Sequence, residues 1–257
     1  MGLALGWLGK GLARFLTRTT HVHGVGPVTA PDQLLACLKP GDVLLVEGNS
    51  RVSTAIKYLT QSTWSHAALY VGAHLAEAGG NPDHGFIEAD MADGVRSVGI
   101  GEFAGAHTRI CRPMGLRESD CRKLIAFAIA HLGNQYDLRN VVDLARYLLP
   151  TPPVPLRFRR RMLALGSGDP TRAICSTLIA QAFQSIRYPI LPVTDTRNAD
   201  RPGCPGCIEE TLRVRHHSLF APRDFDVSPY FQIIKPTLAA GFDFNALHWV
   251  VTPVVEV

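Results

Sequence analysis

Three side chains of types that catalyse acyl transfer occur at informative places in the sequence: Cys175, His66 and Glu88. Cys175 follows a helix-start signal at residues 169–171, so we expect it in the first turn of an apolar helix. Unpaired amide groups and the helix dipole lower the pKa of a thiol there. His66 interrupts an apolar strand and could act as the base, and Glu88, near the end of the next strand, could orient the imidazole. This pattern is consistent with a Cys-His-Glu triad, although a buried inert thiol, a core histidine and a solvated glutamate would give the same spacing.

The elements that must position these residues follow from hydrophobic periodicity and turn chemistry. The sequence predicts helices at 32–38, 50–61, 118–132, 137–149 and 173–186. It predicts strands at 43–46, 65–71, 85–89, 95–98, 108–111, 231–234 and 249–251, and a loop at 192–206. We therefore expect an α+β fold in which a small antiparallel sheet packs against helices.

Two basic segments lie outside this pattern. Residues 1–26 are predicted to form a basic amphipathic N-terminal segment, ahead of a single domain at 27–257 that carries a Pro/Arg-rich insertion at about 150–172. The first helix either docks on its own domain or lies on a membrane surface. In the second case the partner is an anionic membrane surface, contacted through residues 1–20 and the run Arg157 to Arg161.

Composition narrows the class of protein. The chain has 257 residues, of which 19% are charged, and a net charge of +4, which argues against disorder and against nucleic acid as a partner. Six scattered cysteines indicate free thiols in a reducing compartment. No apolar run is long enough to span a bilayer, and the N-terminus lacks the order of a secretory signal. We expect a cytoplasmic protein, with a peripheral position on the inner face of the membrane as the variant.

The other cysteines have simpler interpretations. Cys204 and Cys207 form a Cys-Pro-Gly-Cys sequence, for which metal binding, redox chemistry and an ordinary loop all stay open, the loop being favoured. Cys37, Cys111 and Cys121 fall on apolar faces and are predicted to be core residues.

Several motifs, taken in order, resemble a known family. They are Pro40-Gly41-Asp42-Val43-Leu44, Ser65 to Gly72, Ile87-Glu88-Ala89 with Gly94-Val95, Leu132 to Asp137, and Ile174 to Leu178. They resemble the circularly permuted papain-like amidases, the YiiX/YaeF-like branch of the NlpC-type cysteine peptidases, in which the histidine strand precedes the cysteine helix. The resemblance implies a papain-like permuted fold, and it implies catalytic roles for Cys175, His66 and Glu88.

The resemblance also implies a function. It predicts a cysteine hydrolase that cleaves a peptide-like or acyl-amide bond through an acyl-enzyme on Cys175, without a metal or organic cofactor. Tyr136 matches a family tyrosine that could hold the substrate or the oxyanion, and packing is its alternative role. The insertion has no counterpart in the family pattern. A lipid-directed acyl hydrolase or acyltransferase is the alternative enzyme, although the Asn-Cys-Glu-His signature of the lecithin:retinol acyltransferase group is absent. A non-catalytic membrane-bound binding module is the third interpretation.

Overall fold

The computed structural model describes residues 28–90, 93–134, 174–198, 208–239, 241–246 and 248. Several sequence-based predictions lie outside these residues: the N-terminal segment, the helix at 137–149, the insertion and the strand at 249–251. Tyr136, Cys204 and Cys207 lie outside them too.

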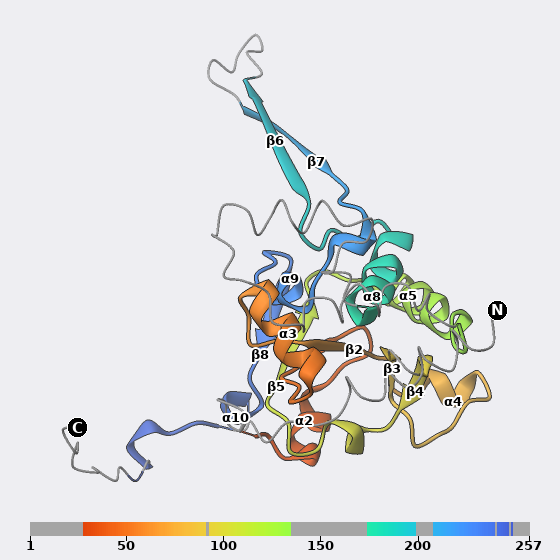
Figure 1. Cartoon of the computed structure of the whole chain (residues 1–257), viewed down its shortest axis with the longest axis vertical. Helices are drawn as coiled ribbons and strands as arrows, with labels where there is room; N and C mark the ends of the chain where they lie inside the picture. The colour runs from red at the N-terminus through yellow and green to blue at the C-terminus, as the bar shows by residue number, and fades with distance from the viewer. Residues whose placement is uncertain are drawn as a thin grey trace.

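The described part of the chain is built on a six-stranded antiparallel sheet with the strand order β4-β3-β2-β1-β5-β8 (Figure 1). The strands are β1 (Val43–Val46), β2 (His66–Tyr70), β3 (Phe86–Asp90), β4 (Gly94–Val98), β5 (Thr108–Pro113) and β8 (Phe231–Ile234). All six agree with strands predicted from the sequence, and the α+β class is confirmed.

Helices cover both faces of this sheet. They are α2 (Pro31–Cys37), α3 (Arg51–Thr60), α4 (His74–Glu77), α5 (Glu118–Ala130), α8 (Ile174–Ser185), α9 (Pro222–Asp226) and α10 (Pro236–Ala239), with short 3-10 turns η1 (Ile100–Phe103), η2 (His217–Leu219) and η3 (Phe244–Ala246). Helices α5 and α8 lie side by side, and α8 packs on β2 and β3 (Figure 1). Helix α2 lies on the opposite face, where it joins a separate cluster of buried hydrophobic residues.

The central strand explains why both faces must be covered. All four residues of β1 are buried, and alternate side chains along a strand point to opposite faces. Leu45 joins the cluster that includes α5 and α8, whereas its neighbour Leu44 joins the cluster that includes α2. The apolar run of β1 is therefore typical of a strand enclosed between two helical layers.

One prediction about secondary structure is wrong. Part of the loop expected at 192–206 is strand β6 (Val193–Asn198), which pairs antiparallel with β7 (Ile208–Arg213) in a hairpin that projects from the body (Figure 1). The Asp and Asn residues of this segment favour turns, but Val193 and Thr196 are β-branched and suit a strand. The segment forms a strand because it pairs with β7, which begins ten residues after the last residue of β6, and a local sequence pattern does not predict that pairing.

Candidate active site

Strand pairing fixes the position of His66. It is the first residue of β2 and lies opposite Val46 of β1, and the Ser65 amide just before it donates to the Val46 carbonyl oxygen at 3.2 Å. The imidazole remains 27% exposed, at the edge of the apolar layer. This one side chain of β2 can therefore exchange protons with a bound molecule while its backbone is held by the sheet.

Glu88 lies beside it on the neighbouring strand. In the β2–β3 register Glu88 faces Ala68, one diagonal step from His66, and long side chains can meet across that step. The Nε2 atom of His66 lies 2.7 Å from Oε2 of Glu88, whose side chain is only 3% exposed. The structure thus brings together the histidine and the acid that were singled out in the sequence.

Arg96, which sequence reasoning missed, completes this carboxylate's environment. It lies directly opposite Glu88 in β4, and its Nε and Nη2 atoms are 2.9 and 2.8 Å from Oε1. Arg96 also contacts Glu102 at 2.8 Å. A buried carboxylate needs partners for both oxygens, and Glu88 has the imidazole on one and the guanidinium on the other. The register of β3 against β4 places Arg96 opposite Glu88, and this register cannot be read directly from the sequence.

Cys175 approaches His66 from the opposite element. It lies in the first turn of α8, is 4% exposed, and interacts through hydrogen bonds with the His66 side chain and the Ala67 amide. Because Nε2 of His66 is hydrogen-bonded to Glu88, Nδ1 is the ring nitrogen available to Sγ of Cys175. β2 pairs with β3 only from Ala68 onward, which leaves the Ala67 N–H to donate to the thiol.

The electrostatics of the three groups favour an ion pair. Burial raises the pKa of the Cys175 thiol, but the charge and hydrogen bond of His66 outweigh it and hold that pKa below its usual value. Burial likewise lowers the pKa of His66, but Cys175 and Glu88 raise it well above the ordinary range. Burial opposes ionisation of Glu88 too, yet His66 and Arg96 hold its pKa below normal. Both directions favour a thiolate facing an imidazolium, which is a nucleophile next to a proton donor.

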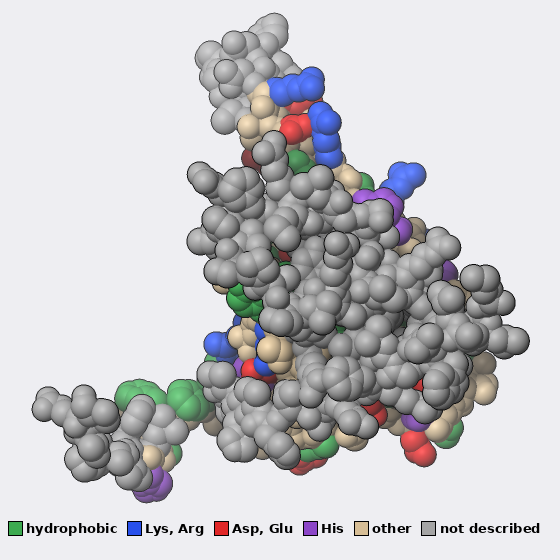
Figure 2. All heavy atoms as spheres, viewed as in Figure 1, with side chains coloured by type: hydrophobic (Ala, Val, Ile, Leu, Met, Phe, Trp, Pro, Cys, Tyr) green, Lys and Arg blue, Asp and Glu red, His purple; other side chains and the backbone are tan. Residues whose placement is uncertain are grey.

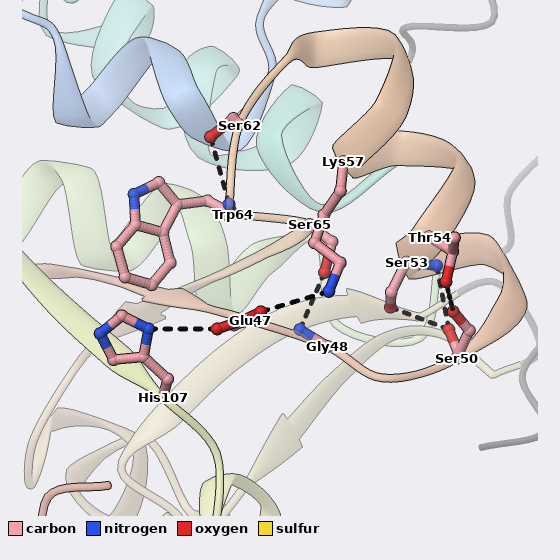
Figure 3. Close-up of polar contacts among 10 residues, drawn as sticks. All are labelled: Glu47, Gly48, Ser50, Ser53, Thr54, Lys57, Ser62, Trp64, Ser65 and His107. Carbon is pink, nitrogen blue, oxygen red and sulfur yellow. Dashed lines mark hydrogen bonds and ion pairs between the residues drawn. The ribbon is translucent and has the colours of Figure 1, made fainter. Parts of the chain in front are cut away.

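A second cluster of polar contacts holds the chain in place where β2 begins (Figure 3). The Gly48 amide donates to Ser65 Oγ at 2.9 Å, and an added Cβ at Gly48 would meet the Ser53 hydroxyl at 2.3 Å, so the loop is tightly closed. The buried carboxylate of Glu47 contacts Lys57 Nζ at 3.3 Å and His107 Nδ1 at 3.2 Å (Figure 3). These contacts join β1, α3 and β5 at the end of the sheet that carries His66.

The other described cysteines differ from Cys175. Cys111 is buried in the core as expected, whereas Cys37 and Cys121 are half-buried and pack against the edges of the two clusters. Burial raises the pKa of Cys111 and of Cys121. The pKa of the Cys175 thiol, by contrast, is lowered.

Two further observations bear on cofactors and membranes. Within the described ranges, no three or more side chains of the His, Cys, Asp or Glu types gather as metal ligands would. The helices whose placement is described include none with both the length and the apolar character to cross a bilayer.

Comparisons with known proteins show which proteins this chain resembles. Residues 37–147 match the model of a family described as the permuted papain-like amidase enzyme, YaeF/YiiX, C92 family. A protein of Escherichia coli strain K12, named "Probable lipoprotein peptidase YaeF", is 25% identical over 185 residues, which are 65% of this chain and 61% of that protein. The chain thus spans about three fifths of that relative's length.

Among solved structures, the crystal structure of the metalloprotein YiiX from Escherichia coli O157:H7 is similar with a TM-score of 0.45 and 16% identity. That alignment covers 77% of this chain and 96% of that chain. The family match confirms the resemblance that the sequence motifs indicated.

Proposed function

Starting from the resemblance of this chain to the circularly permuted papain-like amidases, we propose that it is a cysteine hydrolase that cleaves an amide bond through an acyl-enzyme on Cys175. The observation that carries the proposal is the placement of His66 between two groups, with Glu88 on Nε2 at 2.7 Å and Cys175 on its other side. A base held by a third group beside a nucleophile is the arrangement that covalent acyl transfer requires.

The first half-reaction uses the ion pair directly. The Cys175 thiolate attacks the carbonyl carbon of the bound amide, and the His66 imidazolium then donates its proton to the departing amine nitrogen. The C–N bond breaks as the thioester forms. Glu88 keeps its charge throughout, because its pKa lies below the usual value, and it holds the imidazole in the orientation that faces the sulfur.

In the second half-reaction the neutral imidazole takes a proton from water, which attacks the thioester carbon and displaces the thiolate. The negative oxygen formed in both halves needs hydrogen-bond donors. Backbone N–H groups in the first turn of a helix have no partner within the helix, so the amide of Cys175 is suited to this role. Tyr136 remains the predicted second donor, to be tested as Tyr136→Phe.

The substrate class is part of the proposal. We assign a peptide-like or acyl-amide substrate, because the family match is to amidases. The basic N-terminal segment and the run Arg157 to Arg161 are proposed to bring the enzyme to an anionic membrane surface.

The experiment is a parallel activity profile of the full chain against peptidoglycan fragments, fluorogenic acyl-amides and phospholipid vesicles. Intact-mass analysis after rapid acid quenching detects the thioester. We expect turnover and an acyl adduct with an amide, and loss of both in Cys175→Ala but not in the matched variant Cys121→Ala. Release of fatty acid from phospholipid without amide cleavage would instead identify a lipid-directed acyl hydrolase. The absence of any adduct on Cys175 with all three classes would contradict a hydrolase.

A further inference from the structure

A cavity of about 380 Å³ lies between the C-terminal end of α8 and the base of the β6–β7 hairpin. Its walls are mainly apolar, and they include Ile190, Leu191, Leu212 and Phe220. This volume falls within the roughly 300–1,000 Å³ of sites that take small molecules. Cys175 and Gln184, which lines the cavity, are separated by nine residues of α8, or about 14 Å along the helix axis. The cavity is therefore separate from the candidate active site.

The charged groups of the lining are all of one sign. Arg187, Arg213 and Arg215 contribute to it, and none of the described residues that line it is acidic. The Tyr188 hydroxyl points elsewhere, since it lies 2.8 Å from the Met114 carbonyl oxygen and 2.7 Å from that of Tyr230. The ring of Tyr188 therefore adds to the apolar wall. The guanidinium groups of Arg213 and Arg215 also face carboxylates outside the lining, at 2.5 Å from Asp195 and 3.6 Å from Asp224.

The three arginines are held to different degrees. The Arg215 guanidinium stacks 4.9 Å from the centre of the Phe220 ring and donates to the Leu219 carbonyl oxygen at 3.0 Å, so it is fixed in the wall. Arg213 uses Nε to contact Asp195 at 2.5 Å, and its side chain is 63% exposed. Basic side chains are visible along the projecting hairpin in Figure 2.

Arg187 is the most available of the three. In the described part of the chain no carboxylate pairs with it, and its side chain is exposed. Its backbone has φ +57°, the left-handed conformation that glycine usually adopts just after a helix. An arginine at this position accepts backbone strain that a glycine would avoid, and strain of this kind is a reason to look for a function of the side chain.

We infer that this cavity binds an amphipathic anion, a small molecule with an apolar chain and a carboxylate or phosphate head, with the chain against Leu191 and Leu212 and the head at Arg187 and Arg213. Guanidinium groups recognise carboxylates and phosphates through paired hydrogen bonds, which a lysine or a neutral side chain does not reproduce. The inference stands on the cavity and its charges, and it does not depend on the proposed amide hydrolysis.

The test titrates the full chain with 11-(dansylamino)undecanoic acid and follows the rise in dansyl emission. Decanoate, decyl phosphate and decyltrimethylammonium are then added as competitors. We expect saturable binding that decanoate or decyl phosphate displaces and that decyltrimethylammonium does not, and the tighter of the two anions identifies the preferred head group. Equal displacement by the cation, or no saturable binding, would overturn the inference.

Variants locate the site. Arg187→Gln and Arg213→Gln should each weaken binding about tenfold, as expected for loss of a charged hydrogen bond. Arg197→Gln is the matched control, because Arg197 lies on the same hairpin and is not part of the lining. Arg197→Gln and Cys175→Ala should bind as the unmodified protein does. Unchanged affinity in both lining variants, or lost binding in Cys175→Ala, would place the probe elsewhere and refute the site. Thermal melts of all variants check that the fold is intact.

Discussion

Replacing Glu88 with glutamine removes one negative charge and little else from the candidate active site. The Oε2 atom of Glu88 lies 2.7 Å from His66 Nε2, so the charge that stabilises the imidazolium is lost while the side chain keeps its shape. Two unit charges about 4 Å apart interact by about 4 kcal/mol at an effective dielectric constant of about 20. The glutamine oxygen can still accept the hydrogen bond, which retains about 1 kcal/mol.

The net loss of about 3 kcal/mol destabilises the thiolate–imidazolium pair and lowers the population of that pair about 150-fold. We therefore expect Glu88→Gln to slow alkylation of Cys175 by iodoacetamide at pH 6 by at least about tenfold, measured by peptide mass spectrometry after brief exposure. Amide turnover should fall by up to about 150-fold.

A matched control separates this effect from disruption of the arginine. Glu102 contacts Arg96 at 2.8 Å, as Glu88 does, but has no contact with His66 among the hydrogen bonds described. Glu102→Gln should therefore alkylate within about twofold of the unmodified protein. Full alkylation and turnover in Glu88→Gln, or an equal loss in Glu102→Gln, would show that Glu88 does not act through the imidazole.

Three further predictions concern pH, stability and location. The pKa of the Cys175 thiol lies below its usual value and that of the His66 imidazole lies well above. With rising pH, kcat/KM for amide cleavage should therefore increase through the thiol pKa, stay level across neutral pH and decrease through the imidazole pKa. A maximum only above the usual thiol pKa of about 8.5 would contradict the ion pair. Asp42→Asn should lower the free energy of unfolding by about 3 kcal/mol in urea titrations, because Asp42 is buried and makes contacts of 2.9 and 2.7 Å with Arg112. A loss of only about 0–1 kcal/mol, the size expected for an exposed ion pair such as that of Arg117 with Asp120, would argue against this role. Sedimentation with anionic vesicles should show binding at low salt that high salt and deletion of residues 1–20 both reduce, and its absence at low salt would rule out the membrane-surface helix.

Local pattern was sufficient for most of the sheet. The run Val43–Val46 is apolar and follows a turn, and it is a buried strand at those residues. The helix that carries Cys175 begins one residue from its predicted start. These elements are set by neighbours in the chain, through periodicity and capping, so a sequence contains the information that places them.

Features that depend on register or on distant segments were harder to predict. Arg96 meets Glu88 only because β3 and β4 pair in one register, and a slip of one residue would turn Arg96 to the other face. The β6 strand depends on its partner β7 and was expected to be a loop. The approach of Cys175 to a histidine 109 residues earlier is a tertiary contact, which the family resemblance implied and spacing alone did not.

We propose that His66 converts Cys175 into a thiolate at neutral pH. The most direct measurement is the second-order rate of iodoacetamide alkylation at Cys175 as a function of pH, in the unmodified protein and in His66→Ala, with Cys121 in the same digest as the internal standard. We predict that the reactivity of Cys175 rises at a pH well below that of Cys121, and that His66→Ala moves this rise upward to or beyond the usual thiol pKa. An unchanged pH dependence of Cys175 in His66→Ala would show that His66 does not control the ionisation of this thiol.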